Sequence, residues 1–354
     1  MYSLIDIQKK LLPDLLQIMQ KRYHILRYIN RMQPVGRRSL AQSLGFTERV
    51  LRSEVEFLKE QNLLSITSVG MELTSIGKDL LEKLESVMRE AAGIDVMEEK
   101  LQSMFQIRKV VVVSGDSDES PWIKSELGRA CASRMKVLVP SRNSVASSMK
   151  DSVHGKDIIA VTGGTTMAAV ADKLTPDIIS GDVLFVPARG GIGEDVQNQA
   201  NTICSIMAAN TNQKHRVFYV PDQVSEEIYE SFMKEPMIKE VVENIRTASM
   251  VLHGIGDAIT MAERRKTNAS DMEKLKEEKA VGEAFGYYFN ESGEVVHKVL
   301  TVGLQLSDLD QIPNVIAVAG GASKAKAIRA YLQKAPSSTI LITDEGAAKT
   351  LLMN

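Results

Sequence analysis

Hydrophobic residues near the start of the chain recur at helical spacing. Over residues 14–30 the apolar positions are Leu15, Ile18, Met19, Ile25, Leu26 and Ile29. This spacing places them on one face of an α-helix. Pro13 stands just before the run. Proline suits the first turn of a helix, because the N–H that it lacks would make no hydrogen bond within the helix there. The pattern predicts a helix that begins near residue 13.

Two shorter amphipathic segments follow, and a glycine separates them. Pro34 and Gly36 predict a loop after the first helix. We expect Ser39 to cap the next helix and Gly45 to end it in a tight turn. The apolar residues of this short helix are Leu40, Ala41 and Leu44.

The third helix, expected from residue 48, separates an apolar face from a polar one. Thr47 stands at its N-cap position, and Glu48 suits the positive end of the helix dipole. The predicted apolar face consists of Val50, Leu51, Val55 and Leu58. The other face carries Arg49, Arg52, Ser53 and Glu56. A short helix, a glycine turn and an arginine-bearing helix form the helix-turn-helix pattern, whose second helix contacts base edges in the DNA major groove.

Two short strand-like runs occupy residues 63–74, on either side of Ser68, Val69 and Gly70. A hairpin here would be the wing of a winged helix-turn-helix DNA-binding domain. Arginine suits phosphate oxygens and guanine edges. The residues we expect at operator DNA are Arg37, Arg38, Arg49, Arg52 and Ser53. The alternative, a small helical oligomerisation module, explains the apolar faces but not the arginines.

Residues 75–104 show helical periodicity with one turn signal, Gly93. They predict a helix or a pair of helices, acting either as a subunit contact or as a surface helix of its own domain. We therefore divide the chain into a DNA-binding domain over 1–74, a linker or oligomerisation helix over 75–104, and a larger domain over 105–354.

In the larger domain, apolar runs alternate with segments that suit helices. The runs are VVVVSGD, DIIAVTGGTT, VLFVPARGG, HRVFYVP, SMVLHGIG, NVIAVAGG and TILITDEG. This alternation predicts an α/β fold with a doubly wound, Rossmann-like parallel sheet. Ligands bind such sheets at the carboxyl ends of the strands, where these runs turn glycine-rich. The serine-rich stretch 138–155 is interpreted as a surface loop.

Three of these strand ends combine glycine with cations or hydroxyls. Gly163 and Gly164, with Thr165 and Thr166, lie between a strand and a helix, an arrangement that suits phosphate. The neighbouring run ends with Arg189 in PARGG, and a second glycine turn leads to Lys324. The set of two glycine turns, one arginine and one lysine predicts a site for two phosphate groups. The alternative is that Arg189 and Lys324 pair with acidic residues such as Glu194 or Asp344.

Charge is divided unevenly along the 354 residues. The formal net charge is -2, but residues 1–59 hold eleven Lys/Arg and five Asp/Glu, so +6 lies there and -8 on the rest. A basic module on an acidic body favours a nucleic-acid partner. The two cysteines favour a reducing compartment, and no apolar run is long enough to span a membrane. The start of the chain lacks signal-peptide features. We therefore expect a cytoplasmic protein with no membrane partner.

Sequence signatures of common cofactor and metal sites are missing. No G-x-x-x-x-G-K-[ST] occurs, which disfavours a nucleotide switch, and no G-x-G-x-x-G follows the first strand. The five histidines are scattered without metal-ligand spacing. We expect no metal, no cofactor and no catalytic residues. The two cysteines, Cys131 and Cys204, are predicted to lie in the core.

The order of a winged helix, a linker and a sheet domain with VTGGTT, VPARGG, HGIG and AGG-SK resembles the SorC-type, sugar-binding transcriptional regulators, which are related to the DeoR type. The resemblance implies a repressor of a glycolytic operon. Because one short recognition helix reads few bases, and paired half-sites multiply the contacts, we expect a homodimer or homotetramer. The resemblance implies a sensor domain similar in fold to sugar-phosphate isomerases. It also implies control by a phosphorylated sugar, fructose-1,6-bisphosphate or a related one.

The resemblance also implies ligand roles for particular residues. Those that would bind phosphate oxygens are Gly163, Gly164, Thr165, Thr166 and Lys324. Arg189 would add a cation, Gln199 and Glu283 would bind sugar hydroxyls, and Arg264 would be a further phosphate ligand. The alternative is an isomerase or deaminase with an appended helical domain. Its acid or base would be Glu283, Asp344, Glu345 or His253.

Overall fold

The computed structural model describes residues 10–139, 157–191 and 195–353, so nearly all of the predicted serine-rich loop 138–155 lies outside the described residues. The chain forms two compact units. The first comprises residues up to Met97 together with Ser117–Trp122, and the second comprises Glu98–Asp116 and the chain from Ile123. The domain boundaries at 74/75 and 104/105 stay a prediction.

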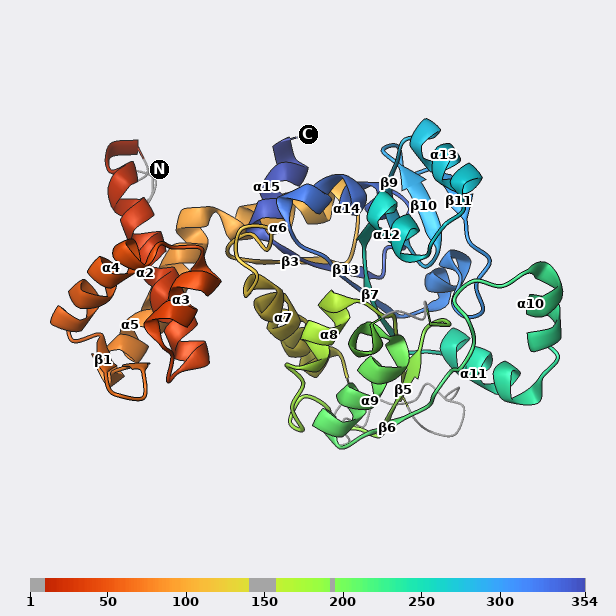
Figure 1. Cartoon of the computed structure of the whole chain (residues 1–354), viewed down its shortest axis with the longest axis horizontal. Coiled ribbons are helices and arrows are strands. Elements are labelled where there is room, and N and C mark those ends of the chain that lie inside the picture. Colours follow the sequence, from red (N-terminus) through yellow and green to blue (C-terminus); the bar gives the residue numbers. More distant parts are fainter. Residues whose placement is uncertain (1–9, 140–156, 192–194, 354) are drawn as a thin grey trace. The chain divides into compact units, whose positions relative to one another are not determined.

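The first unit contains the predicted three helices and hairpin. Its elements are α2 (Pro13–Met32), α3 (Arg37–Leu44), α4 (Glu48–Glu60), β1 (Leu64–Ile66), β2 (Met71–Leu73) and α5 (Ser75–Ala92). Helix α2 begins at Pro13, as expected. Strands β1 and β2 pair antiparallel, with Ser65 opposite Glu72, so the predicted wing is confirmed as a hairpin (Figure 1).

Two of the three capping residues predicted for α3 and α4 are confirmed. Gly45 ends α3 in the left-handed conformation, and the Thr47 hydroxyl accepts a hydrogen bond from the N–H of Val50. The prediction that Ser39 caps α3 was wrong, because the helix begins at Arg37 and Gly36 occupies the N-cap. Backbone hydrogen bonds between Val35 and Met71, 2.9 and 3.2 Å long, hold the chain next to β2 and let it turn directly into the helix.

Helix α4 buries a slightly different face from the predicted one. Leu51, Val55 and Leu58 lie in the core, but Val50 is 42% exposed, so its assignment to the core was wrong. Glu54 lies on the buried face instead, where its carboxylate pairs with Lys21 at 2.5 Å and Arg22 at 2.8 Å. A paired carboxylate can therefore stand on the face where the sequence suggests only apolar residues.

A segment from later in the chain completes the first unit. The Trp122 ring contacts the Tyr28 ring edge-on, with centroids 5.6 Å apart, and the Arg27 guanidinium lies 5.3 Å from the Trp122 ring. The Ser120 hydroxyl donates to the carbonyl of Ser43 at 3.3 Å. Residues 117–122 thus share this unit's hydrophobic core.

The predicted linker is a pair of helices. Helix α5 is capped at its C-terminus by Gly93, which adopts a φ of +68°, and α6 (Ile94–Phe105) begins at the next residue. A left-handed residue between two helices changes the chain direction, which is why one glycine sufficed as a turn signal.

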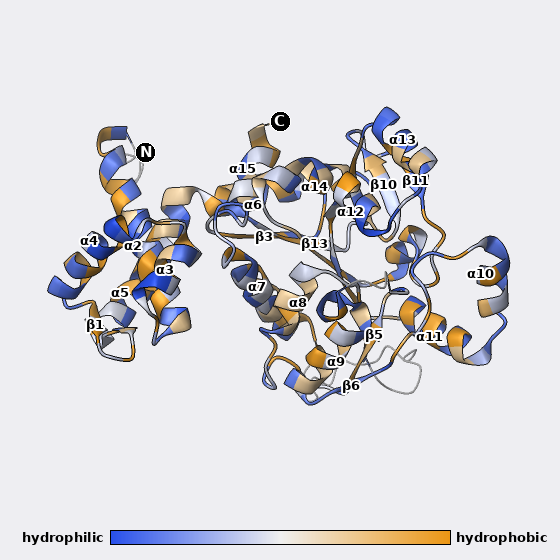
Figure 2. Cartoon of the chain, in the orientation of Figure 1, coloured by the Kyte–Doolittle hydropathy of each residue, from blue (hydrophilic) through white to orange (hydrophobic). Residues whose placement is uncertain are grey.

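The second unit is built on a seven-stranded parallel sheet, as predicted. Its order is β3-β13-β12-β7-β4-β5-β6. The strands are β3 (Lys109–Val113), β4 (Asp157–Val161), β5 (Val183–Pro187), β6 (Lys214–His215), β7 (Met250–Gly254), β12 (Asn314–Val318) and β13 (Thr339–Asp344). Strands such as β3 and β5 are largely hydrophobic (Figure 2).

The strand expected from HRVFYVP is much shorter than its apolar run suggests. Only Lys214 and His215 pair with β5, at the edge of the sheet. Beyond them the chain leaves the sheet, because Phe218 exchanges hydrogen bonds with the side chain of Asn201 and Gly191 bridges to Pro221.

Helices cover both faces of the parallel sheet. They are α7 (Ile123–Leu138), α8 (Thr165–Ala171), α9 (Ala200–Thr211), α11 (Pro236–Arg246), α14 (Ala325–Leu332) and α15 (Glu345–Met353). Parallel crossovers are right-handed. Therefore α7, α8 and α9, which lead across the sheet in one direction, cover one face, whereas α11 and α14 lead back and cover the other (Figure 1).

A second, smaller sheet stands beside the first and was not predicted. It is antiparallel, in the order β11-β10-β9-β8. Its strands are β8 (Gly256–Asp257), β9 (Ala280–Ala284), β10 (Tyr287–Asn290) and β11 (Val295–Lys298). Helices α12 (Ala258–Arg264) and α13 (Ala269–Glu277) pack on it around a small core that includes Leu275 and Tyr288.

The remaining elements are short. They are α10 (Glu226–Phe232), η2 (Val196–Asn198), η3 (Leu306–Gln311) and η4 (Ala322–Lys324). Cys131 in α7 and Cys204 in α9 are fully buried, as predicted. Among the described residues, no helix is long and apolar enough to cross a membrane.

Candidate functional sites

A cavity of about 820 Å³ opens at the carboxyl ends of β4, β5 and β7. All nine residues that were predicted to bind a ligand line it: Gly163, Gly164, Thr165, Thr166, Arg189, Gln199, Arg264, Glu283 and Lys324. They come from six separate segments of the second unit, so the fold brings together what the sequence keeps apart. Their contact with a ligand stays a prediction.

The turn after β4 forms one wall of the cavity. Gly164 has a φ of +120° and stands at the N-cap of α8 without a side-chain cap. Its N–H donates to the carbonyl of Asn198 at 2.8 Å. A Cβ on Gly163 would lie only 2.7 Å from the same carbonyl, so the turn requires glycine there. The first turn of α8 then presents Thr165 and Thr166 at the cavity.

A second glycine turn, after β12, leads to Ser323 and Lys324 on another wall of the cavity. Gly321 has a φ of +100°, and its N–H donates to the buried carboxylate of Asp344 at 2.7 Å. A Cβ on Gly320 would lie 2.4 Å from an oxygen of that carboxylate. Asp344 thereby shapes the turn that leads into η4 and to Lys324 on the cavity wall.

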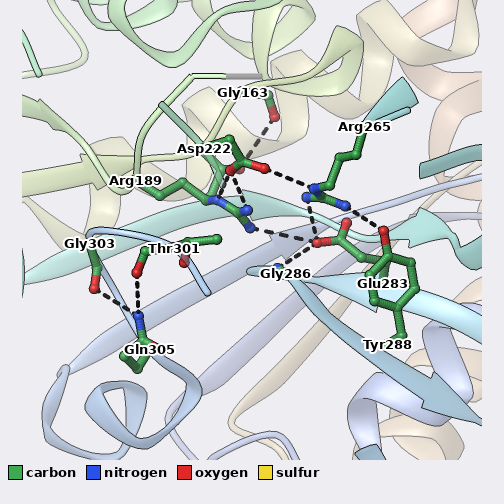
Figure 3. A network of polar contacts seen from close by, with 11 residues as sticks. Gly163, Arg189, Asp222, Arg265, Glu283, Gly286, Tyr288, Thr301, Gly303 and Gln305 are labelled. Atoms are coloured by element: carbon green, nitrogen blue, oxygen red, sulfur yellow. Dashed lines mark hydrogen bonds and ion pairs between the residues drawn. The ribbon is translucent and has the colours of Figure 1, made fainter. Parts of the chain in front are cut away.

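Arg189 lies in a network of buried ion pairs (Figure 3). Its Nε donates to a carboxylate oxygen of Asp222 at 2.7 Å, and its Nη1 lies 3.6 Å from an oxygen of Glu283. The side chains of these three residues are at most 7% exposed. Arg189 is therefore ion-paired, as the alternative held, but its partners are Asp222 and Glu283, and Glu194 lies outside the described residues.

The fourth member of this buried ion network is Arg265, which sequence reasoning missed. Its Nε donates to Asp222 at 2.8 Å, one Nη donates to Glu283 at 2.9 Å, and the other donates to the hydroxyl of Tyr288 at 2.9 Å. Burial alone would lower the pKa of Arg265, but Glu283 and Asp222 outweigh burial and raise it. Burial also raises the pKa of the Tyr288 hydroxyl.

The balance of charge around the cavity is slightly positive. Its basic residues are Lys124, Arg189, Arg264, Arg265 and Lys324, and its acidic ones are Asp195, Asp222, Asp257 and Glu283. Within the buried ion network, the charges of Arg189 and Arg265 are balanced by those of Asp222 and Glu283. Asp195 and Asp257 cap η2 and α12 through backbone N–H groups. The surplus positive charge suits an anionic ligand.

His253 lies on β7, next to the part of the cavity wall formed by Gly254. It is fully buried, with Nδ1 3.0 Å from the carbonyl of Gly254 and Nε2 3.0 Å from the Tyr331 hydroxyl. Burial lowers the pKa of His253 to about 4, against the hydrogen bond to Gly254, which raises it. His253 is therefore neutral at pH 7. No metal-binding group of three or more His, Cys, Asp or Glu occurs within the described ranges.

The residues predicted to contact DNA lie on α3 and α4 of the first unit. Arg38, Arg49, Arg52 and Ser53 are exposed, and Arg37 is half-buried. Arg38 pairs with Glu48 at 3.3 Å, but both side chains are well exposed, so water weakens this pair. Exposed arginines at the start of the second helix of a helix-turn-helix suit contacts with the DNA major groove.

Comparison with known families assigns both units. A family model for the CggR N-terminal DNA binding domain matches residues 18–88, and a model for a sugar-binding domain matches residues 89–353. The chain is 59% identical to the "Central glycolytic genes regulator" of Priestia megaterium and 54% identical to that of Bacillus subtilis, over 99% of both chains in each case.

Solved structures agree with this assignment. A SorC family transcriptional regulator from Enterococcus faecalis is 45% identical, with a TM-score of 0.65, and the match covers 72% of this chain and 99% of that one. The full-length sorbitol operon regulator SorC from Klebsiella pneumoniae is 16% identical, with a TM-score of 0.59 over 96% of this chain and 99% of that one. At 16% identity, the comparison with SorC from Klebsiella pneumoniae supports a shared fold only.

The winged helix and the sugar-binding domain together define a sugar-responsive transcriptional regulator of the SorC type, as the resemblance implied. The chain belongs to the family of central glycolytic genes regulators. Because these relatives are named as regulators and carry a DNA-binding domain, the alternative of an isomerase or deaminase is set aside.

Proposed function

We propose that this protein represses a glycolytic operon in the bacterial cytoplasm, and that fructose-1,6-bisphosphate controls its binding to operator DNA. One observation carries the ligand proposal. The nine predicted residues meet in a single cavity, in which the glycine turn after β4 forms one wall, Lys324 beyond the second glycine turn stands on another, and positive charge is in surplus. A sugar with one phosphate at each end would use both walls, whereas a monophosphate would use one.

The parts of the cavity receive different roles. Gly163, Gly164 and the hydroxyls of Thr165 and Thr166 hold one phosphate. Lys324 and Arg264 supply cations for phosphate oxygens, and Arg189 adds a further cation. Gln199 and Glu283 hold sugar hydroxyls, because an amide oxygen or a carboxylate accepts hydrogen bonds from them. No metal or cofactor enters this proposal.

The effect on DNA follows from thermodynamic linkage. A ligand shifts DNA affinity only if it binds the competing states of the protein with different affinities. One recognition helix reads few base pairs, so the proposed operator complex contains a homodimer or homotetramer on paired half-sites.

Fluorescence anisotropy of a labelled fragment from upstream of a glycolytic operon tests the whole proposal. The protein is titrated onto the fragment at one salt concentration, alone and with a panel containing fructose-1,6-bisphosphate, fructose-6-phosphate, glucose-6-phosphate and inorganic phosphate. We expect the bisphosphate to change the affinity most. Equal effects of every compound would contradict the proposed effector, and the absence of binding would contradict the proposed operator.

A further inference from the structure

The buried ion network joins two walls of the cavity. Arg189 follows β5 of the large parallel sheet, and Asp222 lies in the segment after β6, next to Pro221, which bridges to Gly191, so both stand on one wall. Glu283 lies on β9 of the small antiparallel sheet, and Arg265 directly follows α12, which packs on that sheet. Figure 3 shows the four side chains converging between these elements.

The ion pairs run across the two walls. Asp222 of the first wall binds Arg265 of the second at 2.8 Å, and Glu283 of the second wall lies 3.6 Å from Arg189 of the first. Within each wall, Asp222 binds Arg189 and Glu283 binds Arg265. Each carboxylate therefore contacts both guanidinium groups, and the four charges cancel. Such a closed set fixes all four side chains more firmly than a single ion pair could.

The backbone around Asp222 leaves this residue little freedom. The N–H of Gly191 donates to the carbonyl of Val220 at 3.0 Å, and the N–H of Asp222 donates to the carbonyl of Gly191 at 2.9 Å. A Cβ on Gly190 would lie 2.3 Å from the carbonyl oxygen of Pro221. The segment that carries Asp222 is thus held directly against the turn that carries Arg189.

Glu283 is held with similar firmness on the other wall. One of its oxygens accepts a hydrogen bond from the N–H of Gly286 at 2.6 Å, within the tight turn between β9 and β10. The same oxygen accepts from Arg265, whose other Nη is bound to Tyr288. Tyr288 is fully buried, so this anchor is rigid.

We propose that Asp222 and Arg265 are positioning residues of the effector cavity. Asp222 aims the guanidinium of Arg189, and Arg265 aims the carboxylate of Glu283, so that a cation and a hydrogen-bond acceptor stand side by side on the cavity wall. The inference rests on the proposed function, in which Arg189 and Glu283 contact the ligand. The arrangement selects a ligand that offers an anionic group beside a hydroxyl group, as a sugar phosphate does.

A double-mutant cycle tests the role of Asp222. Calorimetry with fructose-1,6-bisphosphate compares the parent, Asp222→Asn, Arg189→Lys and the double variant. We expect Asp222→Asn to weaken binding about tenfold or more, on the scale of coupling between charged groups in contact. In the Arg189→Lys background the same change should have little further effect. Additive losses, or parental affinity in Asp222→Asn, would overturn the assignment.

A second cycle tests Arg265 through Glu283 in the same way. It uses Arg265→Lys, which keeps the charge but loses the planar fork that binds two carboxylates. Glu283→Gln is its partner. The proposal is supported if Arg265→Lys lowers the ligand affinity of the parent but not that of the Glu283→Gln variant. It is overturned if Arg265→Lys lowers the affinity in both backgrounds.

Two controls separate positioning from folding. Ile316→Ala in the fully buried centre of β12 should lower the Tm without changing ligand affinity. Asp177→Asn, which breaks the exposed pair with Lys136, should change neither quantity. If the Ile316 variant loses affinity as strongly as Asp222→Asn, the effect of Asp222 is only structural and the proposal fails.

A crystal structure of the Asp222→Asn variant distinguishes this inference from the proposed ligand. If the parent binds none of the tested sugar phosphates, the proposed effector fails, yet Arg189 should still leave its position in the variant. An Arg189 guanidinium that keeps its place without Asp222 would overturn the positioning role, whichever ligand the cavity takes.

Discussion

The hydroxyl of Thr166 provides a test of the cavity at the scale of one residue. Thr166→Val keeps the shape of this buried side chain but removes the hydroxyl that we propose binds a phosphate. A hydrogen bond to a charged group contributes about 1.5–3 kcal/mol, so affinity for fructose-1,6-bisphosphate should fall by roughly 10- to 100-fold in calorimetry. Thr166→Ser, which keeps the hydroxyl, is the matched control. An unchanged affinity in the valine variant would remove Thr166 from the ligand site.

Arg52 offers the corresponding test on the DNA surface. Arg52→Ala should weaken operator binding by about 1–3 kcal/mol if the side chain contacts a guanine edge. The measurement is anisotropy at one salt concentration, because phosphate contacts make affinity depend on salt. Arg246→Ala, an exposed arginine on α11, is the control for a lost charge. Ligand affinity should be parental in both variants.

His253 makes the stability of the protein depend on pH. Its pKa is about 4 in the folded state and close to 6.5 when unfolded, so the unfolded chain binds more protons between these values. The stabilisation from the neutral, buried ring is complete above pH 6.5 and is lost as the pH falls towards 4, by roughly 3 kcal/mol. Urea unfolding at pH 7.5 and pH 5 should therefore show a smaller difference for His253→Gln than for the parent.

Two adjacent arginines illustrate what the sequence alone cannot decide about the role of a single residue. Arg264 and Arg265 are adjacent, and the resemblance singled out Arg264. The structure places both on the cavity wall, but only Arg265 belongs to the buried ion network. Which of two adjacent arginines is buried depends on carboxylates 43 and 18 residues away from Arg265 along the chain. No local pattern carries that information.

At the scale of elements, the start of α4 is a sensitive point. The Thr47 hydroxyl accepts the N–H of Val50 at 3.3 Å, and the arginines expected at DNA follow directly. Thr47→Ala should lower the free energy of unfolding of the first unit by about 1 kcal/mol and weaken DNA binding, because the first turn of the helix frays. Thr47→Ser should restore both. Thermal unfolding and anisotropy measure the two effects, and a stable variant with parental DNA affinity would contradict the expectation.

Elements with a strong apolar pattern were predictable, and those without one were not. The strands of the parallel sheet are buried on both faces, so they stand out as continuous apolar runs. The small antiparallel sheet has strands of two to five residues, and β9 includes the charged Glu283. Glu283 lines the cavity and Gly282 packs closely against Ala327 of α14, and both contacts exist only after folding.

At the scale of the whole molecule, the near-neutral net charge conceals an uneven distribution along the sequence. Residues 1–59 carry +6 and the rest of the chain carries -8, but most of that negative charge lies on residues 60–97 and 117–122, which belong to the same unit as the winged helix. The second unit can bind an anion because its cavity gathers five basic and four acidic residues. Local arrangement decides what each unit binds, and the average charge does not.

The first unit is discontinuous in sequence, since it ends with Ser117–Trp122. A fragment cut after α6 therefore lacks the Trp122 ring that packs on Tyr28 and Arg27. Such a truncated DNA-binding fragment would expose an apolar patch and be prone to aggregate. Chimeras that exchange the DNA-binding unit between relatives need to transfer this six-residue segment as well, or the grafted domain will lack a matching piece of its own core.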